Sequence, residues 1–253
     1  MKLSKIDYVC AVPADLTLPD VVYKYRPISE FLFRSLILNQ IWLARPDSFN
    51  DPFEPERIFS GTRFSQALDR DVRQAGVFCM CKGSGNFPMW SYYGDGLRGV
   101  AIGYDLAELL RSLQPVEPCD GESAERWKYV FDLDYCDDGL SEIDEMALLR
   151  NDESTDVQRK KMFATKSEAF LHEQECRIVV QPSPDNSPEF AWQGYGLYRH
   201  DSSAIREVVF GELVSKPDRE AIMQIMAGRE VTFLNAVREK NSFKISVVGA
   251  AAV

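Results

Sequence analysis

Residues 76–105 read GVFCMCKGSGNFPMWSYYGDGLRGVAIGYD, and this stretch contains two of the apolar runs on which the fold depends. The runs 76–81 and 99–104 are short, apolar and bounded by glycine or loop residues, which is typical of buried strands. Asp105 follows the second run, where its carboxylate can cap a helix that extends to about Leu113. The stretch therefore predicts two strands separated by a loop with a short aromatic segment, 89–93, and then a helix.

Within that loop, Gly94 to Gly99 matches G-x-G-x-x-G letter for letter. A dinucleotide-binding loop of this pattern needs a strand before the glycines and a helix after them. Here an aromatic segment precedes them and an apolar strand follows. The glycines therefore predict a tight turn rather than a phosphate-binding loop.

Other segments of the chain repeat this alternation of short strands and helices. Val21–Arg26 is β-branched and aromatic and stops at Pro27, and Ser29 can cap the helix that follows. Further strands are predicted at 41–44, 127–135, 176–180, 205–210, 231–237 and 243–248, and helices near 63–74, 140–170 and 217–227. We expect an irregular arm over 1–20 and one α+β domain over 21–253, with a central twisted, mostly antiparallel sheet flanked by helices.

Composition limits the function classes. The chain has 253 residues with 29 Lys and Arg and 39 Asp and Glu, a formal charge of −10, which argues against a dedicated binder of duplex nucleic acid. The sequence has no apolar run approaching the roughly 18 residues that cross a bilayer, and no signal peptide is recognised at the start. The six cysteines are scattered, which favours reduced thiols and a cytoplasmic location.

Two charged motifs stand out. Glu173 and Glu175 lie at the entrance to a strand, and close carboxylates raise one pKa unless a cation such as Arg177 intervenes. The alternative is a solvated strand edge on which Arg177 balances the charge. Lys24 and Arg26 share one strand face, from which they either reach solvent or meet an anion.

Aromatic and sulfur-containing clusters are more ambiguous. Trp90 and Tyr92 either pack in the core or form a stacking wall for a planar ring. Cys79 and Cys81 share a strand face, but the chain has two histidines and no second Cys pair, so no metal site is predicted. His200 is predicted to lie in a surface turn.

Taken in order, several motifs resemble a widespread bacterial family known as domain of unknown function 2971. The resemblance spans about residues 21–248, and Tyr92 stands where the usual family form has a histidine. The motifs that carry it are Tyr23-Lys24-Tyr25-Arg26, Phe49-Asn50-Asp51-Pro52-Phe53, Met89-Trp90-Ser91-Tyr92-Tyr93 and Glu173-Gln174-Glu175-x-Arg177. The family name supplies no reaction, and the resemblance loosely suggests a bacterial stress or phage-defence setting.

The layout also resembles that of ADP-ribosyltransferases. Tyr25-Arg26 fits the aromatic-Arg pair that ends the first strand of those enzymes, and Glu173-Gln174-Glu175 fits their late Glu-x-Glu. Cys79-Met80-Cys81 stands where a Ser-Thr-Ser element would be expected. The resemblance implies an ADP-ribosyltransferase-like fold and an enzyme that takes NAD as substrate, transferring ADP-ribose to an acceptor or cleaving NAD; the acceptor stays open.

This resemblance implies roles for individual residues. Glu175 would stabilise the developing oxocarbenium ion and hold the ribose 2′-hydroxyl, and Glu173 would orient or deprotonate the acceptor. Arg26 and Lys24 would bind the pyrophosphate, and Trp90 or Tyr92 would stack on the nicotinamide. The ligand-binding set is completed by Tyr23, Tyr25, Asn50, Asp51 and Arg177.

Two other functions stay open. A metal-dependent phosphodiesterase or nuclease could use Asp51, Glu54, Glu173 and Glu175 as oxygen ligands for Mg²⁺, with Lys24 or Lys82 beside the phosphate. A non-catalytic ligand-sensing or interaction module could use the same clusters only to build a pocket. Chelator-sensitive cleavage of nucleic acid would favour the first, and ligand binding without turnover the second.

Overall fold

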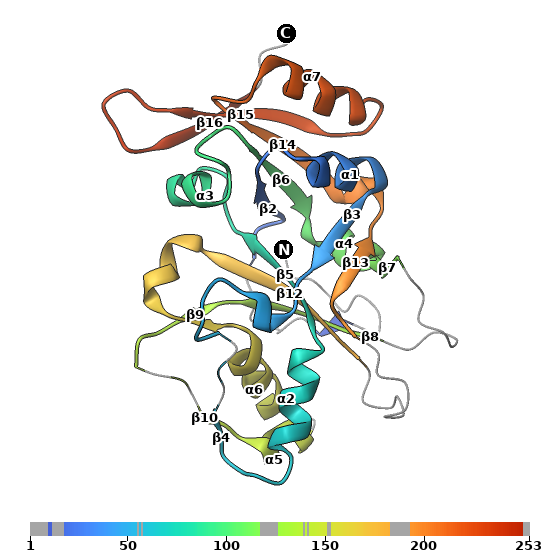
Figure 1. The fold of residues 1–253 in the computed structure, drawn as a ribbon, viewed down its shortest axis with the longest axis vertical. Coiled ribbons are helices and arrows are strands. Elements are labelled where there is room, and N and C mark those ends of the chain that lie inside the picture. The colour runs from blue at the N-terminus through green and yellow to red at the C-terminus, as the bar shows by residue number, and fades with distance from the viewer. Residues whose placement is uncertain are drawn as a thin grey trace.

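The computed structural model describes residues 10–11, 18–54, 56, 58–116, 126–138, 140, 142–150, 153–182 and 193–249. In this part of the chain a nine-stranded sheet, with strand order β1-β8-β12-β5-β2-β6-β14-β15-β16, runs through the molecule. Its neighbours are antiparallel except for the pairs β1–β8 and β14–β15. The predicted α+β class with a mostly antiparallel central sheet is confirmed (Figure 1).

The elements follow the predicted order closely. The strands of the large sheet are β1 (Cys10–Ala11), β2 (Val21–Arg26), β5 (Gly76–Cys81), β6 (Val100–Asp105), β8 (Arg126–Asp132), β12 (Glu175–Pro182), β14 (Ile205–Gly211), β15 (Thr232–Arg238) and β16 (Ile245–Gly249). Smaller strands are β3 (Gln40–Leu43), β4 (Ile58–Phe59), β7 (Gln114–Pro115), β9 (Asp134–Tyr135), β10 (Glu142–Ile143), β11 (Thr165–Lys166) and β13 (Gly196–Arg199). The helices are α1 (Glu30–Leu38), α2 (Ser65–Arg73), α3 (Phe87–Tyr92), α4 (Leu106–Ser112), α5 (Glu145–Arg150), α6 (Glu153–Phe163) and α7 (Lys216–Ile225), with short 3-10 turns η1 (Pro46–Ser48), η2 (Glu168–Glu173) and η3 (Ser202–Ala204).

Local capping explains where two helices begin. The side chain of Ser29 accepts a hydrogen bond from the Leu32 N–H at 3.2 Å, so α1 starts directly after the strand that Pro27 ends. The Asp105 carboxylate accepts the Glu108 N–H at 2.9 Å, so α4 follows β6 without a loop. Both capping predictions are confirmed.

Helices cover both faces of the sheet. On one face α1, α4 and α7 pack Leu32, Leu36, Leu109 and Ile222 into the largest apolar cluster. On the other face α2 and α6 cover β5, β8 and β12, and α3 covers the part of the sheet near β2 and β6. In Figure 1, α2, α5 and α6 gather at one end of the molecule and α7 lies at the other.

The sheet opens between β2 and β5. These neighbouring strands are paired only through Tyr23 and Cys81, whereas β2 pairs with β6 along its whole length. At the other end of β5, Val77 exchanges both backbone hydrogen bonds with Ala44 instead, each 2.8 Å long. The middle of β5 therefore lacks a strand neighbour on this side, and a gap results.

Three local details differ from or extend the predictions. Residues 89–92 of the aromatic segment belong to a helix, α3, which Asn86 caps by accepting the Met89 N–H, and Tyr93 is its C-cap residue. Most of the predicted arm, residues 1–9 and 12–17, lies outside the described residues, and Cys10–Ala11 forms a strand against β8. The tight turn at Gly94–Gly99 is confirmed, since the Gly99 N–H donates to the Gly94 carbonyl oxygen at 2.9 Å and Gly96 has a φ of 58°.

Candidate functional site

A cavity of about 620 Å³ occupies the gap between β2 and β5. Consecutive residues of both strands line it, Tyr23–Pro27 from β2 and its end and Val77–Cys81 from β5. Successive side chains of a strand point to opposite faces of the sheet. Consecutive residues can therefore line one cavity only because β2 and β5 separate here and the cavity reaches both faces of the sheet. Its volume lies within the range of about 300–1,000 Å³ that is usual for small-molecule sites.

Two cationic side chains of β2 line one side of the cavity. Lys24 Nζ donates a hydrogen bond to the Cys79 carbonyl oxygen at 2.7 Å and lies 5.3 Å from the centre of the Phe78 ring. The Arg26 guanidinium lies 5.5 Å from the Phe31 ring, and no ion pair joins it to a carboxylate in the described residues. Neither cation forms an ion pair within the described part of the chain, so this wall is suited to an anionic ligand.

Burial decides the pKa values of both groups. Burial, together with the charge of Arg26, lowers the pKa of Lys24 to about 8, although the charges of Glu175 and Glu173 partly offset this effect. Burial likewise lowers the pKa of Arg26. Near neutral pH Lys24 is therefore still mostly charged, but it loses its proton far more easily than a solvent-exposed lysine.

The opposite side carries Glu175 and Arg177. Arg177 Nε donates to Glu175 Oε1 at 2.7 Å and Nη2 donates to Oε2 at 3.1 Å, a bidentate pair. Burial alone would raise the pKa of Glu175, but the charge and hydrogen bonds of Arg177, helped by Lys166, lower this pKa to about 2. Glu175 is thus a fixed carboxylate anion and not a proton acceptor.

Glu173 is held by a chain of hydrogen bonds. The Tyr93 hydroxyl donates to Glu173 Oε1 at 2.7 Å and accepts from Asn50 Nδ2 at 2.8 Å. Lys166 Nζ donates to Glu173 Oε2 at 2.7 Å and lies 3.4 Å from Glu175 Oε2. Burial raises the pKa of Tyr93, and its hydrogen bond to Glu173 raises it further, so Tyr93 keeps its proton.

Glu54 completes the buried charged group. Its carboxylate lies 2.6 Å from Arg177 Nη2 and 2.9 Å from Lys166 Nζ. Burial raises the pKa of Glu54, and the two cations counteract that effect. Three carboxylates thus share two cations, and we call Glu54, Lys166, Glu173, Glu175 and Arg177 the buried ion cluster.

Strand register explains how distant charges meet. Cys81 pairs with Glu175 on one side and with Tyr23 on the other, and paired residues of antiparallel strands point to the same face. Glu175 therefore lies on the face of Tyr23, and Lys24 belongs to the opposite face. Only the gap between β2 and β5 lets Lys24 and Arg26 line the same cavity as the carboxylates.

The structure places Glu173 differently from the prediction. Glu173 ends η2, and Gln174 then adopts a left-handed conformation with φ 44° before β12 begins. Glu173 and Glu175 are therefore not neighbours on one strand face. They converge because both approach Lys166. The alternative of a solvated strand edge is wrong, since both residues are only about 4% exposed.

The aromatic residues divide into core and cavity. Trp90 is fully buried, donates from Nε1 to the Ser84 carbonyl oxygen at 2.8 Å and meets Tyr25 edge-on. Trp90 does not line the cavity, so the prediction that it stacks on a ligand is wrong. Tyr92 lines the cavity and is 70% exposed, and Tyr23 lines it while donating to Glu207.

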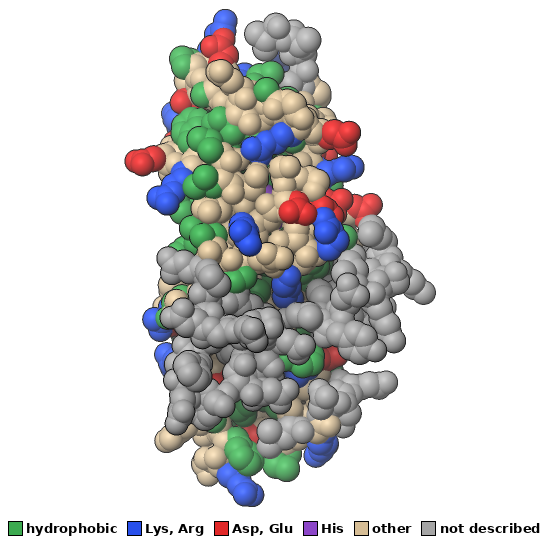
Figure 2. All heavy atoms as spheres, turned by 90° about the vertical axis from the view of Figure 1, so that its right-hand side faces the viewer, with side chains coloured by type: hydrophobic (Ala, Val, Ile, Leu, Met, Phe, Trp, Pro, Cys, Tyr) green, Lys and Arg blue, Asp and Glu red, His purple; other side chains and the backbone are tan. Residues whose placement is uncertain are grey.

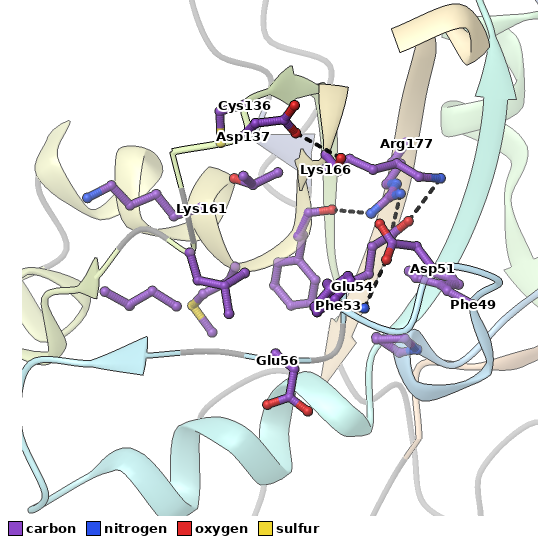
Figure 3. Close-up of a pocket in the computed structure, with 17 residues that line it drawn as sticks. Phe49, Asp51, Phe53, Glu54, Glu56, Cys136, Asp137, Lys161, Lys166 and Arg177 are labelled. Carbon is purple, nitrogen blue, oxygen red and sulfur yellow. Dashed lines mark hydrogen bonds and ion pairs between the residues drawn. The ribbon is translucent and has the colours of Figure 1, made fainter. Parts of the chain in front are cut away.

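Of the other predicted residues, Asn50 lies in this cavity and Asp51 does not. Asp51 lines a second, smaller cavity of about 230 Å³. Both cavities are lined by Phe49, Glu54, Lys166 and Arg177, so part of the buried ion cluster is a shared wall (Figure 3). The structure therefore separates Asp51 from the other predicted ligand-binding residues.

Three residues were not predicted in the roles they have here: Lys166 and Glu54, which belong to the buried ion cluster, and Tyr93, which bonds to it. Lys166 lies in a short strand, β11, and its neighbours in the chain carry no motif that would mark it. Tyr93 stood inside an aromatic motif, but its hydroxyl contact with Glu173 spans 80 residues. Glu54 was considered only as a metal ligand. All three lie next to the predicted site residues in space, and this proximity cannot be read from the sequence.

No metal site appears in the described part of the chain, where no group of three or more His, Cys, Asp or Glu side chains could hold an ion. Glu54, Glu173 and Glu175 are instead bonded to Lys166 and Arg177.

The prediction that His200 lies in a surface turn is wrong. His200 is 6% exposed and packs edge-on against Tyr104.

The outer surface adds little to this picture. Figure 2 shows acidic and basic side chains interspersed over the visible described part of one face, without a large patch of one sign. Among the described residues, no helix has both the length and the apolar character needed to span a bilayer. The charged residues of the buried ion cluster lie inside the molecule instead.

Comparison with known proteins gives one match. Residues 89–178 match the family model described as "Protein of unknown function (DUF2971)". This segment begins at Met89 in α3 and ends at Ile178 in β12, and it includes Lys166, Glu173, Glu175 and Arg177. No curated protein and no solved structure matches the chain.

Proposed function

We propose that this chain binds NAD in the cavity between β2 and β5 and breaks the bond between nicotinamide and ribose, passing ADP-ribose to an acceptor or to water. One observation carries the proposal: the cavity has Lys24 and Arg26, two cations with no ion-pair partner among the described residues, on one wall and the fixed anion Glu175 on the other. A dinucleotide that reacts in this way has matching charges, an anionic pyrophosphate and a sugar that becomes cationic.

The reaction needs no oxidant or reductant. The bond from ribose C1′ to nicotinamide breaks, and both electrons leave with the nicotinamide nitrogen. The acceptor then bonds to C1′ and gives up a proton. Because Glu175 stays ionised, it would stabilise the positive charge on the sugar rather than remove a proton.

Glu173 is the proposed partner of the acceptor, with a restricted role. Both of its oxygens already accept hydrogen bonds, from Tyr93 and from Lys166. Neither oxygen is therefore free to accept a proton from the acceptor without giving up one of these bonds. We therefore propose that Glu173 mainly orients the acceptor, and that Tyr92, which is exposed in the cavity, is the stacking partner for the nicotinamide.

The test is incubation of the purified protein with NAD and detection of free nicotinamide by mass spectrometry. Glu175→Gln should abolish release, because an amide cannot stabilise the cationic sugar. Glu212→Gln is the matched control, since Glu212 bonds Arg238 at the surface outside the cavity. Circular dichroism of each variant verifies that the protein is folded. Full nicotinamide release by a folded Glu175→Gln variant would reject the mechanism.

Binding assays decide between this proposal and its alternatives. NAD should raise the thermal midpoint of the wild-type protein, and Arg26→Gln should weaken that shift. NAD binding without any product would instead indicate a ligand-sensing module. Cleavage of RNA or DNA that a chelator suppresses would indicate a metal-dependent phosphodiesterase.

A further inference from the structure

The smaller cavity contains a buried carboxylate oxygen without a partner. Asp51 is 1% exposed, and its Oδ1 accepts the Phe53 N–H at 2.9 Å. Its Oδ2 is equally buried and has no hydrogen-bond partner in the described part of the chain. Buried carboxylates are rarely left in this state, because removing charge from water without a compensating bond is costly.

The charges around this cavity favour a cation over an anion. Four residues that line it carry carboxyl groups, Asp51, Glu54, Glu56 and Asp137, and three are cations, Lys161, Lys166 and Arg177. The two buried cations, Lys166 and Arg177, already contact carboxylates of the buried ion cluster at 2.6–2.9 Å. Carboxyl groups therefore outnumber cations in the lining, and the buried cations are engaged with other carboxylates than Asp51.

Two other charged side chains of the cavity, Asp137 and Lys161, already have hydrogen-bond partners. Asp137 accepts hydrogen bonds from the Ser167 hydroxyl and the Glu168 N–H. Lys161 donates to the Glu142 carbonyl oxygen at 3.0 Å. Figure 3 shows Asp51 and Glu54 on the Arg177 side of the cavity, with Lys161 on the opposite side in this view. Asp51 Oδ2 is therefore a buried carboxylate oxygen of this cavity at which a ligand could bond without breaking a contact of the described residues.

The rest of the lining is apolar and sets the size of a ligand. Phe49, Leu140, Ile143, Met162 and Phe163 contribute to the walls. The volume of about 230 Å³ is below the lower end, about 300 Å³, of typical ligand cavities. A short aliphatic chain fits this space better than a nucleotide or an aromatic drug-sized molecule.

We propose that the smaller cavity binds a small organic cation, a primary ammonium or guanidinium group on a short aliphatic chain, with Asp51 Oδ2 as the hydrogen-bond acceptor. The aliphatic part would lie against the apolar walls and the cationic end would supply the missing charge. This site does not depend on the proposed NAD reaction, because its ligand and its lining carboxylate differ. The shared wall of Glu54, Lys166 and Arg177 places it next to the larger cavity.

The experiment is an NMR titration of the ¹⁵N-labelled protein with butylammonium, with the Phe53 amide as reporter. We expect the Phe53 signal to shift, because its N–H is bonded to the same carboxylate. Neutral 1-butanol, which has nearly the same shape, should bind at least about tenfold more weakly. No nucleotide is added, so the result is independent of the NAD proposal.

Two variants provide the comparison. Asp51→Asn retains an oxygen for the Phe53 N–H but removes the charge, and we expect butylammonium to bind at least about tenfold more weakly. Glu56→Gln makes the same chemical change at an exposed residue of the cavity and should alter binding by no more than about twofold.

Three results would overturn the proposal. These are equal binding to Asp51→Asn and wild type, equal binding of 1-butanol and butylammonium, and absence of any shift at Phe53, which would mean that water alone occupies the site. If Asp51→Asn does not fold, the comparison of the two ligands on the wild-type protein still decides.

Discussion

The two walls of the larger cavity differ in whether their cationic side chains are paired with carboxylates. Arg177 and Lys166 are 2% and 5% exposed and are bonded to Glu54, Glu173 and Glu175. Lys24 and Arg26 lie across the same cavity without a carboxylate partner in the described residues. The first pair stabilises the fold by balancing buried charge, and the second pair is costly to the fold unless a ligand supplies the missing anion.

The pKa directions support this contrast. The carboxylates around Arg177 raise its pKa despite burial, whereas burial lowers the pKa of both Lys24 and Arg26. Charge that is paired in the folded protein stabilises it, and charge that is buried without a partner destabilises it. The predictions below test this difference, beginning with the largest expected effect.

The largest effect is expected at Arg177. Arg177→Leu leaves Glu54 and Glu175 buried with a single cation, so the free energy of unfolding should fall by about 3–5 kcal/mol. Urea denaturation monitored by circular dichroism measures this loss. Arg238→Leu is the matched control, because Arg238 makes a comparable bidentate contact with Glu212 at the surface and should change stability little. Similar losses in both variants would contradict the structural role of the buried ion cluster.

Arg26 should show the reverse behaviour. Arg26→Met removes a cation without a carboxylate partner, so unfolding stability should be unchanged or higher, while affinity for a dianionic nucleotide falls by at least about tenfold. Calorimetric titration with ADP-ribose and thermal unfolding of the same samples give both values. A large loss of stability with unchanged affinity would make Arg26 a structural residue and remove the contrast between the walls.

Lys24 adds a pH dependence to nucleotide binding. Since its pKa is about 8 in the folded protein, affinity for ADP-ribose should decrease as the pH rises through about 8. The unfolded chain holds this proton up to about pH 10.4, so between these two values the contribution of Lys24 to folding stability rises with pH. Titrations at several pH values check the first effect, and Lys24→Arg should abolish it. A pH-independent affinity in the wild type would exclude Lys24 from the ligand site.

The smallest effect is expected at Tyr93, which joins the loop at Asn50 to the buried ion cluster. Tyr93→Phe removes the hydrogen bond to Glu173, and we expect a loss of about 0.5–1.5 kcal/mol in unfolding free energy. Because Glu173 retains Lys166, the cluster itself should persist. Urea denaturation measures the change, with Tyr92→Phe as the neighbouring control. A loss as large as that of Arg177→Leu would show that Tyr93 is essential to the cluster.

Much of the fold could be predicted from local sequence. The apolar runs at 76–81 and 99–104 gave β5 and β6, and the capping residues Ser29 and Asp105 marked the starts of α1 and α4. Each depends on contacts within a few residues, so the pattern is visible in the chain itself. The site could be predicted only in part: Arg26, Lys24, Glu173 and Glu175 line one cavity, whereas Trp90 packs in the core and Asp51 lies in another cavity.

Local sequence by itself determined the kinds of elements, their order and the alternation of cationic residues along β2. Tertiary structure alone decided that β2 and β5 separate after one residue pair, and that Lys166, 112 positions from Glu54 (166 − 54), joins Glu173 and Glu175. The reason is physical. Helix capping and the alternation of side chains along a strand depend on residues that are close in the sequence. A gap in a sheet depends instead on which distant segments bond to the same backbone groups. Here both Ala44 and β2 pair with β5.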